Sequence, residues 1–92
     1  MITGQMLQRV HNGAQWLDSV MPGWAGKVNL AELDMAQCLH CMLGQVKPLD
    51  HDYYWYMDNK PFNWDVIHGF AAGLTSYRAL TDLWAMEVRA RL

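Results

Sequence analysis

The 92 residues carry seven basic and nine acidic side chains, and this net charge of −2 lacks the positive excess that binding to a nucleic-acid backbone requires. The hydrophobic content of 52% excludes a disordered chain, yet no run approaches the ~20 apolar residues of a membrane helix. Polar residues such as Gln5, Gln8 and Arg9 interrupt the N-terminus, so we expect no signal peptide. We therefore expect one domain over residues 1–92, in the cytoplasm, with no membrane insertion and no nucleic-acid partner.

The first predicted element is a helix over residues 3–20. Its apolar side chains recur with the i, i+3, i+4 spacing of one buried face, and they are Met6, Leu7, Val10, Ala14, Leu17, Val20 and Met21. Pro22 ends this helix, and Trp24 is expected to fold back onto the core. Gly13 lies mid-helix, where it costs about 1 kcal/mol relative to alanine. This glycine either marks a close contact of the helix with another element or has no structural role.

The middle of the chain predicts short helices. Asn29 and Glu32 have the spacing of a capping box, which favours a helical turn at residues 30–34. A helix over residues 35–43 follows, with Gly44 as its stop.

Two further short helices are predicted before the end of the chain. One covers residues 53–57, although 53–56 can also be extended. The other begins at Asn63 or Asp65 and ends at His68, where a histidine more often caps a helix than catalyses a reaction.

The last predicted element is a helix over residues 76–91, capped by Thr75 or Ser76. Its apolar stripe consists of Tyr77, Leu80, Leu83, Trp84 and Val88. Arg89 and Arg91 lie in the last turn, where the helix dipole favours cations. The predicted fold is therefore all-α, a small single-domain helical bundle in which two longer terminal helices enclose short central ones.

Cys38 and Cys41 form a CxxC pair, which is the first candidate site. A structural zinc ion needs four ligands, usually from a second cysteine pair or from two closely spaced histidines, and this sequence has neither. A thioredoxin-like redox site requires a preceding strand, and none is predicted. The pattern favours two buried thiols and no cofactor. A zinc or redox site at Cys38 and Cys41 is the alternative.

Six of the 11 aromatic residues lie within residues 53–64, and they are Tyr53, Tyr54, Trp55, Tyr56, Phe62 and Trp64. Four adjacent aromatic side chains cannot all face inward on a helix or a strand. Exposed tyrosine and tryptophan are typical anchors of protein interfaces. This segment therefore predicts a surface for a partner protein or a second copy of the chain, against the alternative that most of these rings wrap the core.

Asp50, His51 and Asp52 permit a metal or acid–base cluster, but acidic residues at a helix start explain them as well. No nucleophile elbow, phosphate-binding loop, dinucleotide motif or HExxH motif occurs. We therefore expect a protein that is not an enzyme.

Several short pieces of the sequence form a recognisable pattern. They are GAQWLD at residues 13–18, PGW at 22–24, VNLAELDM at 28–35, CLHCMLGQ at 38–45, HGF at 68–70 and YRALTDLW at 77–84. The pattern resembles small proteins of no established activity that are encoded by mycobacteriophages and related actinobacteria. The resemblance implies an accessory protein of a phage or prophage that acts in a bacterial cytoplasm by binding a host protein.

Overall fold

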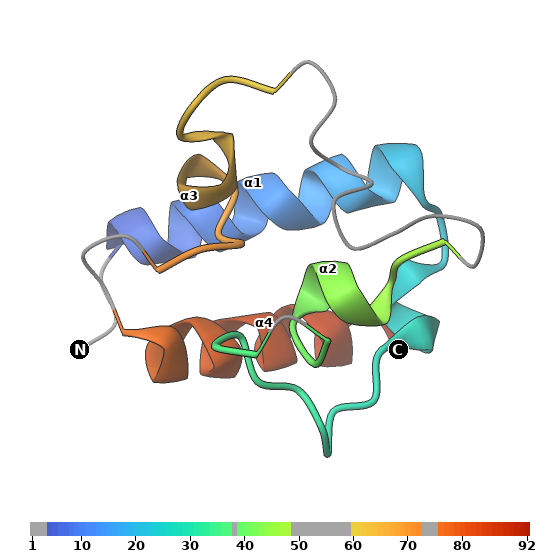
Figure 1. Cartoon of the computed structure of the whole chain (residues 1–92). Helices are drawn as coiled ribbons and strands as arrows, with labels where there is room; N and C mark the ends of the chain where they lie inside the picture. Colours follow the sequence, from blue (N-terminus) through green and yellow to red (C-terminus); the bar gives the residue numbers. More distant parts are fainter. Residues whose placement is uncertain (1–3, 38, 49–59, 73–75) are drawn as a thin grey trace.

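The computed structural model describes residues 4–37, 39–48, 60–72 and 76–92, and every described element of secondary structure is helical. Two long helices, α1 (Gly4–Val20) and α4 (Tyr77–Arg91), lie at the two ends of the chain. Between them come the 3-10 helix η1 (Trp24–Lys27) and the short helices α2 (Met42–Gln45) and α3 (Trp64–Ile67). The all-α prediction, with two longer terminal helices around short central ones, is confirmed (Figure 1).

Helices α1 and α4 lie side by side and run in the same direction (Figure 1). His11 in the middle of α1 lies 3.7 Å from Glu87 of α4, and Asp18 near the end of α1 pairs with Arg91 at the end of α4. A parallel pair cannot be joined by a short loop. The short elements therefore lie on a long return connection that covers the apolar faces of both helices.

Helix α1 buries the face that its spacing predicts, with Met6, Val10, Gly13, Ala14 and Leu17 in the interior. Leu7 and Val20, which flank that stripe, are about half exposed instead. Gly23 ends the turn after α1 with a φ of 83°, a left-handed conformation that suits glycine. The indole of Trp24 then lies in the core, as expected.

The N-cap of helix α4 is Ser76, whose hydroxyl accepts a hydrogen bond from the amide of Ala79 at 3.0 Å. The predicted N-cap is thereby confirmed. The buried face of α4 consists of Ala79, Leu80, Leu83, Trp84 and Val88. Tyr77, which the spacing predicts on the same stripe, is 42% exposed.

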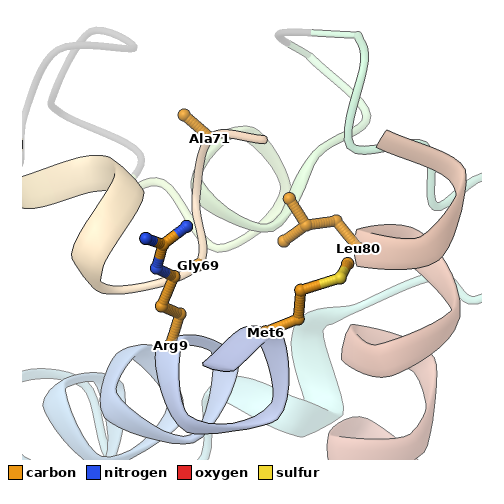
Figure 2. Close-up of a pocket in the computed structure, with 5 residues that line it drawn as sticks. All are labelled: Met6, Arg9, Gly69, Ala71 and Leu80. Carbon is orange, nitrogen blue, oxygen red and sulfur yellow. The ribbon is translucent and has the colours of Figure 1, made fainter. Parts of the chain in front are cut away.

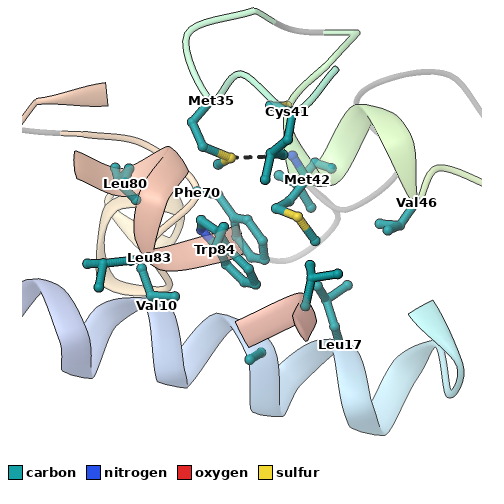
Figure 3. Packing of buried hydrophobic residues seen from close by; sticks show 14 of the residues in the cluster. Val10, Leu17, Met35, Cys41, Met42, Val46, Phe70, Leu80, Leu83 and Trp84 are labelled. Carbon is teal, nitrogen blue, oxygen red and sulfur yellow. Dashed lines mark hydrogen bonds between the residues drawn. The ribbon is translucent and has the colours of Figure 1, made fainter. Parts of the chain in front are cut away.

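The core is one cluster to which every described helix contributes, and Trp84 lies within it fully buried (Figure 3). Its indole N–H donates to the carbonyl of Gly69 at 2.7 Å, so the one polar group of this side chain is satisfied. Met35 and Met42 pack in the same cluster, and the amide of Met42 lies 3.4 Å from the sulfur of Met35. Thioethers adapt to irregular gaps, which suits a core assembled from short helices and turns.

The predicted helix over residues 35–43 is wrong. Side chains satisfy the amides at its start: the Asp34 carboxylate accepts from Ala36 at 2.9 Å, and the Thr81 hydroxyl of α4 accepts from Met35 at 2.9 Å. These local and long-range bonds compete with the helical ladder. The helix starts only at Met42, and Gly44 lies inside it.

The capping box before residue 30 is also wrong. The Asn29 side chain accepts from the amide of Ala31 at 3.0 Å, and the amide of Glu32 reaches only the Asn29 carbonyl. The chain forms a turn at residues 30–32. The predicted helix over 53–57 lies outside the described residues.

Helix α3 agrees with its prediction, with Asn63 as its N-cap and His68 as its C-cap. The His68 imidazole lies 2.8 Å from the Trp64 carbonyl through Nδ1, so this histidine caps the helix. Gly69 follows with a φ of 73° and turns the chain toward Phe70 of the core.

Candidate functional surface

The described part of the aromatic segment contains one exposed ring and one buried ring. Phe62 has a relative exposure of 103%, whereas Trp64 has only 8%. Trp64 is thus a core residue, and its ring is not available as an anchor in the way that Phe62 is. Tyr53, Tyr54, Trp55 and Tyr56 lie outside the described residues.

Trp64 belongs to a group of aromatic rings that extends from the surface into the core. Its ring stacks on His68 at a centroid distance of 4.3 Å and on Phe70 at 5.6 Å. Phe70 in turn stacks on Trp84 at 5.2 Å. These contacts pack α3 against the core, and the exposed Phe62 lies two residues before this helix.

Trp16 of α1 forms the second side of this group. Its ring meets that of Trp64 at a centroid distance of 4.8 Å and an angle of 77°. The ammonium of the exposed Lys60 lies 5.3 Å from the centroid of Trp64 and 5.7 Å from that of Trp16. Both distances are within the ~6 Å range of a cation–π interaction.

A charged cluster joins the C-terminal ends of α1 and α4. The Arg91 guanidinium binds both oxygens of Asp18, at 3.1 and 3.0 Å, and Glu87 at 2.5 Å. The hydrogen bond from Arg91 lowers the pKa of Asp18 and raises that of Arg91. Asp18 also accepts from the indole N–H of Trp24 at 2.8 Å. Because each charge already has a partner, this cluster acts as a clasp between the helices.

Among the hollows that the described residues line are two beside the long helices. The first holds about 10 Å³, close to the minimum for a single water molecule, and is lined by Met6, Arg9, Gly69, Ala71 and Leu80 (Figure 2). It is too small for a substrate. The second, of about 230 Å³, is an open depression beside Arg91 and Asp18, whose charges are paired.

The cysteine pair is only partly described. Cys41 is 2% exposed, packs beside Met35 and Met42, and is the N-cap residue of α2, while Cys38 lies outside the described residues (Figure 3). Within the described ranges, no three histidine, cysteine or acidic side chains come together in a way that could hold a metal ion. The trio Asp50, His51 and Asp52 also lies outside the described residues.

Comparison with known proteins finds no matching family model, no similar curated protein and no similar solved structure. No helix in the described part of the chain is long and apolar enough to cross a membrane.

Two features of this surface could not be found from the sequence. Lys60 lies 44 positions after Trp16, and only the packing of α3 against α1 brings them together. Likewise, Asp18 and Arg91 are separated by 73 positions. The position of Arg91 in the last turn of α4 indicates an interaction with the helix dipole but does not reveal a carboxylate on another helix.

Proposed function

We propose that this chain is a protein-binding module that acts without catalysis, and that the segment 53–64 supplies its binding surface. The observation that carries the proposal is the complete exposure of Phe62 two residues before Trp64, which packs in the core. Large aromatic side chains dominate the energetics of protein interfaces when they insert into a partner. Because Phe62 lies two residues before the packed helix α3, binding would order mainly its side chain.

The resemblance to small phage and actinobacterial proteins supplies the setting of this proposal. The partner would be a host protein in a bacterial cytoplasm or a second copy of the chain. The negative net charge of −2 supports a protein partner over a nucleic acid. A zinc or redox role for Cys38 and Cys41 is the alternative, and the burial of Cys41 gives it no support.

The test is affinity capture from an actinobacterial lysate with the wild-type chain and two matched variants. Phe62→Ala removes the proposed anchor. Met86→Ala removes an apolar side chain of α4 that is 58% exposed. We expect Phe62→Ala to lose a partner that Met86→Ala keeps, while both keep the helical circular dichroism spectrum. Equal capture by both variants would contradict the proposed surface.

Self-association is tested separately by sedimentation equilibrium of the same proteins. If the partner is a second copy, the wild-type chain forms a dimer and Phe62→Ala shifts it to the monomer. Tyr54→Ala and Trp55→Ala extend the test to the rest of the segment. Unfolding of these two variants would assign their rings to the core and leave Phe62 as the anchor.

A further inference from the structure

We propose that residues 29–40 form a lid that opens as a unit from the rest of the folded chain, and that Gln45 and Thr81 are the latches that hold it shut. The structure describes all of these residues except residue 38, and they project beside α4 (Figure 1). The lid has the length of a compact Ω-loop, a class of surface loop whose two ends lie close together. It is a different part of the chain from segment 53–64 and does not depend on the proposed function.

The main chain of the lid is hydrogen-bonded to itself. In the described part of the chain, every bond between main-chain groups that involves residues 30–40 stays between Asn29 and Cys41. The amide of Asp34, for example, donates across the loop to the His40 carbonyl at 3.2 Å, and the amide of Gln37 donates to the Asp34 carbonyl at 3.1 Å. Movement of the lid as a whole breaks none of these bonds, so the lid can open without unfolding first.

The first latch is the side chain of Gln45, which joins both ends of the lid to α2. Its amide oxygen accepts a hydrogen bond from the amide of Asn29 at 2.6 Å. Its amide nitrogen donates to the carbonyls of Asn29 and His40, at 3.3 and 2.8 Å. Helix α2 is anchored in the core by the buried Met42 and Leu43, so Gln45 ties the lid to the body of the protein.

The second latch is Thr81 of α4, which holds the middle of the lid. Its hydroxyl accepts from the amide of Met35 at 2.9 Å and donates to the Tyr77 carbonyl at 2.8 Å. The side chain of Met35 points from the lid into the core, where its sulfur lies 3.4 Å from the amide of Met42 (Figure 3). Leu33 is the other buried side chain of the lid. Hydrogen bonds to two side chains and the burial of two apolar residues therefore keep the lid closed.

Opening of the lid changes the apolar surface of the protein. It takes Leu33 and Met35 out of the core and uncovers Met42, which is fully buried when the lid is closed. A ligand that binds this apolar surface shifts the chain toward the open form in proportion to its preference for that form. The lid thus gives the chain a second conformation with its own binding properties.

The experiment is native-state hydrogen exchange of the full chain, followed amide by amide in ¹H–¹⁵N NMR spectra at increasing urea concentrations below the unfolding transition. The amides of Met35 and Gln37 report on the lid, and those of Val10 in α1 and Leu83 in α4 report on the whole fold. We expect the two lid amides to exchange through a common opening that depends little on urea. After correction for intrinsic rates, they should exchange at least about tenfold faster than the two helix amides.

Variants of the latches test their roles. Gln45→Met keeps the length of the side chain and removes its hydrogen bonds, so it should accelerate both lid amides by at least about fivefold, although neither amide is bonded to Gln45. Thr81→Val removes the second latch and should accelerate the amide of Gln37 in the same way. Gln8→Met is the matched control, because it removes one exposed side-chain bond to Asn12 on α1 and should leave both lid amides at their wild-type rates.

Gly13→Ala separates opening of the lid from unfolding of the whole chain. Gly13 lies in the interior of α1, so this substitution destabilises the closed and the lid-open forms alike. It should therefore accelerate exchange at Val10 about five- to 150-fold and leave Met35 at its wild-type rate.

Two results would overturn the proposal. Equal acceleration of Val10 and Met35 by Gly13→Ala would show that the lid opens only when the whole fold unfolds. A wild-type exchange rate of Met35 in Gln45→Met would show that Gln45 is not a latch. Phe62→Ala should leave the lid amides unchanged, so the lid and the protein-binding surface can fail independently.

Discussion

Gly13 of α1 lies directly against the main chain at His68, so that a Cβ on residue 13 would stand 2.0 Å from the His68 carbonyl oxygen. The same Cβ would lie 2.9 Å from the Trp84 ring. Of the two explanations that the sequence allowed for this glycine, the structure selects the close contact. At this position α1 lies in close contact with the C-cap of α3 and with α4.

Replacing Gly13 by alanine should destabilise the protein although alanine is the better helix former. The helix gains about 1 kcal/mol, but the clash with a backbone carbonyl forces displacements that cost more. We expect Gly13→Ala to lower the free energy of unfolding by about 1–3 kcal/mol net, measured by urea denaturation. Gly4→Ala in the same helix meets nothing within 4 Å and should change it by less than about 0.5 kcal/mol.

The hydrogen bond from Trp84 to Gly69 predicts that phenylalanine at position 84, although aromatic, destabilises the protein. Trp84→Phe removes the indole N–H, leaves the Gly69 carbonyl without this donor and opens a small cavity. We expect a loss of about 2–4 kcal/mol in thermal or chemical unfolding. Trp16→Phe, at a partly exposed position, should lose about 1 kcal/mol. Similar losses for both variants would refute the role of the buried hydrogen bond.

The clasp between Asp18 and Arg91 predicts a dependence of stability on pH. Because the pKa of Asp18 is lower in the folded protein than in the unfolded chain, its ion pair stabilises the fold above about pH 4 and is lost as the pH falls further. The Asp18 side chain is 49% exposed, so solvent screening limits the effect to about 0.5 kcal/mol.

Asp18→Asn tests this dependence, because asparagine keeps an acceptor for the Trp24 indole and loses the charge. Its deficit in unfolding free energy relative to wild type should be largest near neutral pH and vanish in acid. Asp82→Asn is the control, since Asp82 is exposed on α4 and forms no ion pair among the described residues. A deficit that is constant with pH would show that the clasp is not electrostatic.

The burial of Cys41 predicts that its thiol reacts slowly with reagents in the native protein. We expect a water-soluble thiol reagent to modify Cys41 only after unfolding, at 2% exposure in the native protein. Elemental analysis of the purified protein tests the zinc alternative at the same time. Stoichiometric zinc that is lost from Cys38→Ala would establish that alternative.

The sequence predicts the terminal helices and α3 but not the course of residues 30–41, and the difference has a physical basis. In α1 and α4, a repeated apolar spacing and the Ser76 cap act over neighbouring residues, so they are visible locally. The course of residues 30–41 depends on contacts such as the one between Met35 and Thr81, which are 46 positions apart. Helix spacing cannot reveal such a contact.

The same dependence on long-range contacts limits what the sequence can predict about the aromatic segment 53–64. The aromatic composition of segment 53–64 indicated that some rings are exposed, but Phe62 and Trp64 are equally aromatic and nearly adjacent. Only the packing of α3 on α1 buries Trp64 and leaves Phe62 in solvent.

The proposed role of Phe62 as the anchor for a partner protein can be tested by a capture experiment with isotope-labelled lysates. Wild type, Phe62→Ala and Met86→Ala are each used as bait in differently labelled lysates, and the ratios are read by mass spectrometry. We expect a partner whose captured amount falls at least about tenfold with Phe62→Ala and stays at the wild-type level with Met86→Ala. A partner retained equally by all three baits would contradict it.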